Sequence, residues 1–212
     1  MEDRTYQKVA GIILVVIIFG VAIYGSYLPM RKAEIFITTL QDLQTSPATS
    51  LQDLQTRLSI PLDYPSPIGQ EELVRNMANS VLAFIQQGGD ASSSAQLISY
   101  LNSYYEPILA SGKGMSFGQD LYIQGAINEI AFAQTGDPSY LAASKQYYLE
   151  ANQLGPDRPQ ALYGLFDVYR AEGDVTNTFM IGNKILSNWN DLRIRASLLQ
   201  FASSTTKTGV TK

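Results

Sequence analysis

The chain has 212 residues, of which 45% are hydrophobic, with a formal net charge of −4 and neither histidine nor cysteine. The negative charge and the lack of a Lys/Arg cluster argue against a nucleic-acid partner. Without His or Cys there is no imidazole base, no thiol nucleophile and no disulfide, and the common ligands of zinc, copper and haem are missing. We therefore expect no catalytic residue, no cofactor and no metal site.

An apolar segment of residues 9–29 follows a short N-terminal flank of residues 1–8. Residues 9–28 contain no charged side chain. A helix of this length, at about 1.5 Å per residue, spans the roughly 30 Å hydrocarbon core of a bilayer. Tyrosines flank it where interfacial aromatic residues are expected, namely Tyr6, Tyr24 and Tyr27. We therefore predict one transmembrane anchor in a lipid bilayer.

Two alternatives stay open for this segment. A cleaved signal peptide is disfavoured because the apolar run is long and no clear small-x-small site precedes Leu28. A buried helix of a soluble protein is disfavoured because the segment is apolar on all faces. Charge does not decide the orientation, because Arg4 and Lys8 precede the span and Arg31 and Lys32 follow it.

Residues 30–65 are predicted to form a helical stalk and a Pro-rich connection. The stalk helix runs from Met30 to Gln44, and a short helix follows with an apolar face of Leu51, Leu54 and Leu58. Residues Ile60 to Ile68 carry three prolines, which favour an extended connection.

A helical domain is predicted over residues 66–202, with a helix start at Ser66-Pro67, and a disordered tail over residues 203–212. The dipeptide Gly-Asp occurs at 89–90, 136–137 and 173–174. A period of roughly 20–50 residues is typical of stacked helical hairpins.

The stretch between the last two Gly-Asp turns shows the pattern most clearly. Asp137 is a good N-cap, and Gly155 followed by Pro156 is expected to end the first helix with a left-handed glycine. Asp157 is expected to cap the second helix with Gln160 as its capping-box partner. The apolar faces predicted for the two helices consist of Leu141, Tyr148, Ala151 and Leu154, and of Leu162, Leu165, Phe166 and Tyr169.

The spacing resembles tetratricopeptide repeats. Motif positions are matched by Leu165, Tyr169 and Gly173-Asp174 in one unit, and by Ser144, Tyr148, Ala151 and Pro156 in the unit before. Gly182, Thr178 and Asn190 depart from the pattern. The resemblance implies an all-α fold class: a single N-terminal transmembrane helix followed by a tetratricopeptide-like helical-hairpin stack.

A second resemblance is carried by a membrane span followed by three short motifs. These are Tyr-Pro-Ser-Pro-Ile-Gly-Gln-Glu-Glu at 64–72, Gln-Leu-Gly-Pro-Asp-Arg-Pro-Gln at 153–160 and Tyr-Arg-Ala-Glu-Gly-Asp at 169–174. Together they resemble the C-terminal region of bacterial O-antigen ligase or polymerase-like membrane proteins. That resemblance implies the inner (cytoplasmic) membrane and a repeat domain on its outer side. The multi-span part that carries the glycan chemistry has no counterpart here, so no catalytic residue transfers.

One set of polar residues is a candidate partner-binding groove. Gln160, Tyr163, Asp167 and Arg170 are spaced three, four and three apart, which places them on one helix face. Repeat stacks bind peptides and partner helices on such faces. The alternative is a solvated face with an Asp167–Arg170 pair worth about 0.2–0.5 kcal/mol.

These observations favour a membrane-anchored helical-repeat scaffold for protein–protein interaction in the bacterial envelope, accessory to surface-polysaccharide (O-antigen) assembly. Its expected partner is a protein or peptide, such as a multi-span glycan-assembly protein. A detached module of an O-antigen ligase or polymerase-type enzyme is the rival from another class. A translocon-accessory, chaperone-like subunit is a third hypothesis, because the layout also resembles single-span, repeat-bearing translocon subunits.

Overall fold

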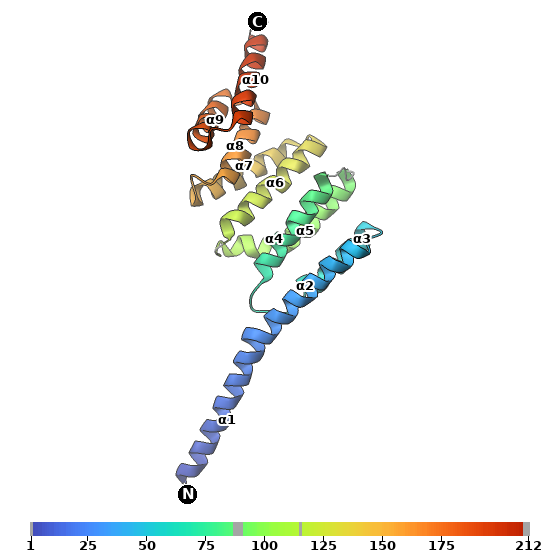
Figure 1. The fold of residues 1–212 in the computed structure, drawn as a ribbon, viewed down its shortest axis with the longest axis vertical. Helices are drawn as coiled ribbons and strands as arrows, with labels where there is room; N and C mark the ends of the chain where they lie inside the picture. Colours follow the sequence, from blue (N-terminus) through green and yellow to red (C-terminus); the bar gives the residue numbers. More distant parts are fainter. Residues whose placement is uncertain (1, 87–90, 115, 210–212) are drawn as a thin grey trace. The chain divides into compact units, whose positions relative to one another are not determined.

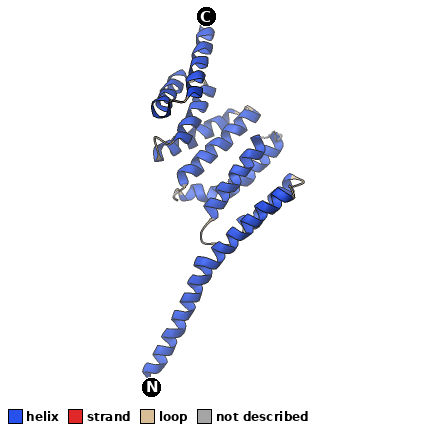
Figure 2. Cartoon of the chain, in the orientation of Figure 1, coloured by secondary structure: helices blue, strands red, loops and turns tan. Residues whose placement is uncertain are grey.

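The computed structural model describes residues 2–86, 91–114 and 116–209. These residues form helices joined by short connections, without a strand among them (Figure 2). The predicted all-α class is therefore confirmed. The chain divides into two units, residues 1–81 and residues 82–212, and we describe each by itself.

The first unit begins with α1 (Glu2–Ala22), a π-helical turn η1 (Ile23–Tyr27) and α2 (Leu28–Thr45), which follow one another as a single long helix (Figure 1). In the π turn, the N–H of Leu28 donates to the carbonyl of Ile23, five residues earlier. Pro29 explains the wider turn, since its ring lacks an N–H and would clash with the carbonyl four residues back in a regular helix.

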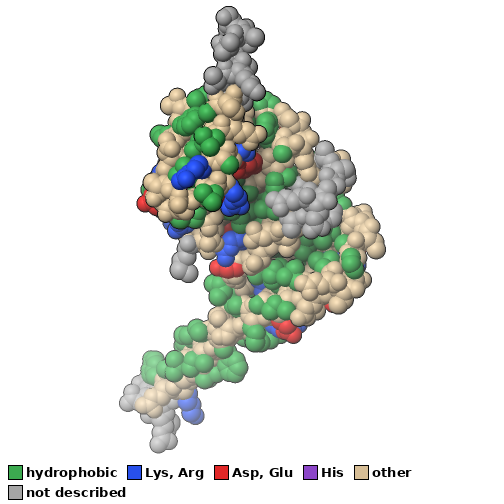
Figure 3. Space-filling view, turned by 45° about the horizontal axis from the view of Figure 1, so that its top comes forward, with side chains coloured by type: hydrophobic (Ala, Val, Ile, Leu, Met, Phe, Trp, Pro, Cys, Tyr) green, Lys and Arg blue, Asp and Glu red, His purple; other side chains and the backbone are tan. Residues whose placement is uncertain are grey.

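The N-terminal helix exposes its apolar side chains along its whole length. At least half of the surface of each large apolar side chain is exposed here, as shown by Ile12, Leu14, Val16, Ile18 and Phe19. Figure 3 shows hydrophobic side chains along much of the helix that leads to the N-terminal end of the chain. Within the described part of the chain, the helix Tyr6–Thr45 is the one long and apolar enough to cross a membrane.

The connection after the stalk is shorter than predicted, because residues 60–62 belong to a helix. After Thr45, α3 (Leu51–Leu62) packs against α2, and Leu58 and Leu62 are buried. The helix continues through Pro61, which is tolerated in the last turn of α3 because its buried ring offsets the missing N–H. The connection is therefore limited to residues 63–69, and the next helix begins at Gln70 rather than at Ser66-Pro67.

A buried lysine holds this connection against the stalk. Lys32 is only 3% exposed, and its ammonium group donates to the carbonyls of Leu62 (3.4 Å) and Tyr64 (2.8 Å) and to the Gln70 side-chain oxygen. Tyr64 and Gln70 lie more than thirty positions after Lys32 in the chain, so these bonds are long-range contacts. The sequence pattern had placed Lys32 only among the charges that flank the span.

We predict that Lys32→Ala loosens the 63–69 connection. The substitution leaves three oxygen acceptors without their donor, and an unsatisfied buried polar group costs about 1–3 kcal/mol. Limited proteolysis of the full chain in lipid nanodiscs should then cut within residues 63–69 at a lower protease concentration. Lys113→Ala, which removes an exposed lysine in a turn, is the control. Equal cleavage of the two variants would contradict a structural role for Lys32.

The second unit contains the end of α4 (Gln70–Gln86) and six further helices. Consecutive helices from α5 to α10 pack side by side, and α8 also contacts α6 (Figure 1). The bounds are α5 (Ala91–Ser111), α6 (Phe117–Thr135), α7 (Pro138–Leu154), α8 (Pro159–Glu172), α9 (Val175–Trp189) and α10 (Leu192–Gly209).

At one end of this unit the predicted turn cannot be compared with the structure, and at the other end the predicted tail is helical as far as Gly209. The first Gly-Asp turn, at 89–90, lies outside the described residues. At the other end, α10 continues to Gly209, whereas the sequence pattern predicts a disordered tail from Ser203. Residues 210–212 lie outside the described part.

Several predicted helix ends are confirmed. Asp137 caps α7 by accepting from the N–H of Ser139 at 2.9 Å. Gly173 ends α8 in the left-handed region with a φ of 73°, where glycine carries no steric penalty. Asp174 then caps α9 by accepting from the N–H of Asn177 at 3.0 Å.

The predicted start of α8 is wrong. The helix begins with Pro159, and its N-cap is Arg158, without a side-chain cap hydrogen bond. Asp157 therefore does not form a capping box with Gln160. The reason is local, because Pro159 needs no N–H partner in the first turn and holds the residue before it in an extended conformation. Gly155 is also extended, with a φ of −158°, and not left-handed.

The predicted apolar faces of α7 and α8 form much of the core of this unit. Leu141, Tyr148 and Ala151 of α7 are buried, as are all four predicted residues of α8. Leu154 is the exception, because this last residue of α7 is 56% exposed.

Candidate functional site

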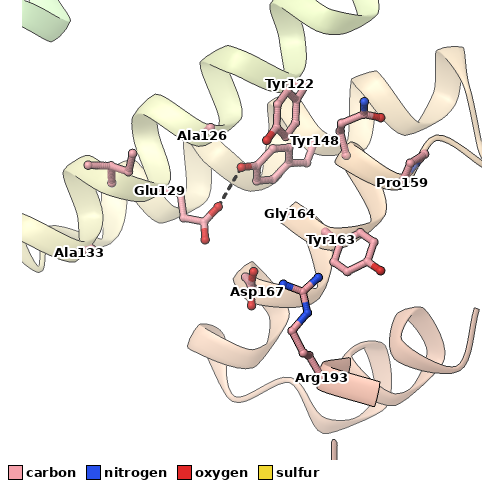
Figure 4. Close-up of a pocket in the computed structure, with 12 residues that line it drawn as sticks. Tyr122, Ala126, Glu129, Ala133, Tyr148, Pro159, Tyr163, Gly164, Asp167 and Arg193 are labelled. Carbon is pink, nitrogen blue, oxygen red and sulfur yellow. Dashed lines mark hydrogen bonds between the residues drawn. The ribbon is translucent and has the colours of Figure 1, made fainter. Parts of the chain in front are cut away.

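A cavity of about 640 Å³ lies where α6, α7 and α8 meet, and we call it the α6–α8 groove (Figure 4). One residue from the start of α10, Arg193, also lines it. Its polar lining comprises Tyr122 and Glu129 of α6, Tyr148 of α7, and Gln160, Tyr163 and Asp167 of α8. Side chains from four helices thus converge on one concave site.

Three of the four residues predicted from the spacing on α8 line this groove, namely Gln160, Tyr163 and Asp167. Arg170 is not one of the lining residues, but its guanidinium is 3.0 Å from the Asp167 carboxylate and 5.7 Å from the centre of the Phe166 ring. The structure therefore brings all four to one face of α8, and Asp167 and Arg170 form the i,i+3 pair that the spacing allows.

Tyr148 is held at the floor of the groove by two glycines. A Cβ atom at Gly125 of α6 or at Gly164 of α8 would lie under 3.0 Å from the Tyr148 ring. Glycine at both positions lets α6 and α8 approach the ring from either side. The hydroxyl of Tyr148 donates to Glu129 Oε2 at 2.8 Å, as Figure 4 shows. The packing of one ring therefore fixes the position of a carboxylate.

The two carboxylates of the groove have pKa values above those of free side chains. Burial raises the pKa of Glu129, and this effect outweighs the hydrogen bond from Tyr148, which acts in the opposite direction. Burial also raises the pKa of Asp167, opposed by the charge of Arg170. The Tyr148 hydroxyl stays protonated, because burial and the neighbouring Glu129 raise its pKa.

We predict that Glu129→Gln stabilises the protein at alkaline pH. Since the folded-state pKa of Glu129 is raised, the folded chain binds this proton more tightly than the unfolded chain, and stability falls as pH rises through the interval between the two pKa values. Glutamine keeps the acceptor for Tyr148 without the charge. The variant should therefore have a higher melting temperature than the wild type at pH 8, and the difference should shrink towards pH 4.

Circular dichroism of the full chain in detergent micelles measures this effect. Glu150→Gln, on α7 and outside the groove lining, is the matched control and should show no such pH-dependent gain. A Glu129→Gln melting temperature below that of the wild type at pH 8 would show that the charged form contributes to the fold.

Tyr163 has a structural contact besides its place in the groove. Its hydroxyl donates to Asp191 Oδ2 at 2.7 Å, and its ring centre lies 6.2 Å from that of Trp189. Asp191 also pairs with Arg193 at 3.3 Å, and the bond from Tyr163, with those from Arg193, lowers the pKa of Asp191 to about 2. Tyr163→Ala would therefore disturb the start of α10 as well as the groove.

The spacing argument missed Glu129, Tyr122 and Arg193. It gave α6 an apolar face of Leu121, Ile127, Ala131 and Phe132 and did not consider the other sides of that helix. In the structure α6 is covered on more than one side, since α5, α7 and α8 all contact it. A usable signal was present, because Tyr122, Ala126, Glu129 and Ala133 recur at helical spacing opposite the predicted face.

The groove offers aromatic faces, hydrogen-bonding groups and charges of both signs, which is the chemistry of a binding site. Within the described residues, no group of three or more Asp or Glu side chains could hold a metal ion. Comparisons of the chain with protein-family models, with curated proteins and with solved structures found no match.

Proposed function

We propose that this chain is a membrane-anchored helical scaffold that binds a protein partner in the α6–α8 groove. The observation that carries the proposal is the convergence of polar and aromatic side chains from four helices on one cavity, with Gln160, Tyr163 and Asp167 among them (Figure 4). Concave faces of stacked helices bind extended segments and partner helices in this way.

The place of action in this proposal is the inner membrane of a bacterial cell, with residues 31–212 outside the cytoplasm. The exposed apolar helix supports a retained anchor. The motifs at 64–72 and 153–160, which resemble those of O-antigen ligase-like proteins, support a role in surface-polysaccharide assembly. A multi-span membrane protein of that assembly is the proposed partner.

Photocrosslinking in intact cells tests the scaffold function. A photoreactive amino acid replaces Gln160, which is exposed and lines the groove, or Gln153, which is exposed on α7 outside it. We expect position 160 to capture one discrete protein and position 153 to capture none. Capture of many unrelated chains from position 160 would favour a chaperone-like subunit. Equal labelling from both positions, or none from either, would overturn the groove as the docking site.

Protease accessibility tests the location. In cells whose outer envelope has been opened, protease should digest residues 31–212 while the inner membrane is intact. Digestion only after lysis would place this part in the cytoplasm and would remove the proposed link to surface polysaccharides.

A further inference from the structure

Glu129 differs from the other charged groups around the α6–α8 groove. One of its oxygens accepts from the Tyr148 hydroxyl at 2.8 Å. Among the described residues, none forms an ion pair with it. By contrast, the neighbouring carboxylates each have a cation within ion-pair distance. Asp167 pairs with Arg170 at 3.0 Å, and Asp191 pairs with Arg193 at 3.3 Å. The groove lining therefore contains one carboxylate whose charge has no bonded cation of its own.

The position of this carboxylate is fixed before any partner binds. Tyr148 is fully buried, and its ring packs closely against Gly125 and Gly164. The hydroxyl that holds Glu129 is thus part of the core packing. A ligand group that binds Glu129 meets a prearranged acceptor, which reduces the ordering cost of binding.

The surroundings of Glu129 suit a long alkyl chain. Ala126 and Tyr122 lie on the same helix, about one and two turns before Glu129, and Tyr163 lies across the groove (Figure 4). The rings of Tyr122 and Tyr148 lie with their centres 5.9 Å apart. Lysine and arginine side chains place their methylene groups along such surfaces and their charge at a polar end, and aromatic rings attract the cation itself.

We propose that the α6–α8 groove takes a lysine or arginine side chain of the bound partner, with its cationic end on the Glu129 carboxylate. This inference rests on the proposed function, because it names the chemistry of the segment that the scaffold holds. An acidic segment would meet the Glu129 carboxylate, which has no bonded cation among the described residues. A purely apolar segment would cover the Glu129 carboxylate without supplying a hydrogen-bond donor, which is unfavourable.

Selection of peptides on the full chain in lipid nanodiscs tests the proposal. A phage-displayed library of random twelve-residue peptides is selected on the wild type, and the binders are sequenced. We expect lysine or arginine to be enriched at one fixed position. The peptide with the highest affinity should bind Glu129→Gln about tenfold to a hundredfold more weakly, since a hydrogen bond to a charged group is lost. Glu150→Gln should bind it as the wild type does.

A double-mutant cycle then isolates the contact. Replacing the enriched basic residue of the peptide by norleucine should weaken binding to the wild type and have little further effect on Glu129→Gln. Binders without a basic preference, or equal binding to the wild type and Glu129→Gln, would overturn this inference while the scaffold function stands. Each selected peptide is also tested on the Gln160→Ala plus Arg170→Ala variant. If this variant binds every peptide as well as the wild type does, the groove is not the binding site and the proposed function itself is overturned.

Discussion

Gly164→Ala is expected to destabilise the second unit strongly. The new methyl group overlaps the ring of Tyr148, which is fully buried. We expect a net loss of about 2 kcal/mol in the free energy of unfolding. A clash with three ring atoms lies at the upper end of the range of about 1–3 kcal/mol that overpacking costs, and alanine's helix preference offsets about 1 kcal/mol of it. Gly125→Ala, on the other side of the ring, should behave alike.

Urea unfolding of the full chain in detergent micelles, followed by the fluorescence of the single tryptophan, Trp189, measures the loss. The matched control is Gly118→Ala on the same helix as Gly125. Its new methyl group would come closer than 3.0 Å only to the end of the flexible, exposed Arg158 side chain and should cost little. If Gly118→Ala and Gly164→Ala lost equal stability, the clash with Tyr148 would not be the cause.

A second variant connects the loss to the tyrosine. Tyr148→Ala should cost about 3–5 kcal/mol, as expected for removing a buried aromatic side chain. In that background Gly164→Ala should cost nothing further, because the ring it would overlap is gone. Additive effects of the two substitutions would contradict the proposed contact.

The second large effect concerns binding. Replacing Gln160 and Arg170 together by alanine should abolish partner capture by the full chain in membranes while leaving the melting temperature nearly unchanged. Both side chains are exposed, and the Arg170 pair with Asp167 is an i,i+3 surface pair worth about 0.2–0.5 kcal/mol. Capture is measured by crosslinking from a photoreactive residue at position 133, which is exposed and lines the groove, with thermal unfolding recorded in parallel.

Tyr163→Ala provides the contrast in this experiment. It should lower capture and melting temperature together, because Tyr163 also holds Asp191 and contacts Trp189. If the Gln160 and Arg170 double variant lost stability to the same extent as Tyr163→Ala, the face of α8 would be structural. If the double variant captured the partner normally, the docking site would lie elsewhere.

Features that depend on near neighbours in the chain were predictable. The apolar run before Leu28 already indicates a membrane-length helix, and the structure shows one. Asp137, Gly173 and Asp174 occupy the helix ends that their backbone preferences predict. Where two local preferences compete, the prediction was wrong, as at α8, where Pro159 and not Asp157 sets the first turn.

The candidate groove was predictable in part. One helix face already groups Gln160, Tyr163, Asp167 and Arg170, because their spacing follows from the helical repeat alone. Their spacing along α8 could not reveal which side chains of other helices lie opposite them in the groove. Glu129 comes from another helix, and its contact to Tyr148 joins residues nineteen positions apart.

By itself, the sequence determined the helical class, the helix ends at Asp137, Gly173 and Asp174, the apolar N-terminal span and the face of α8 that carries the candidate residues, since short-range sterics and periodicity decide these. Only the tertiary structure decided that Lys32 is buried against the 63–69 connection and that Tyr148 fits between two glycines. It also decided that Glu129 enters the groove without a bonded cation. Such features depend on which distant side chains share a buried space, and burial changes both their hydrogen bonds and their ionisation.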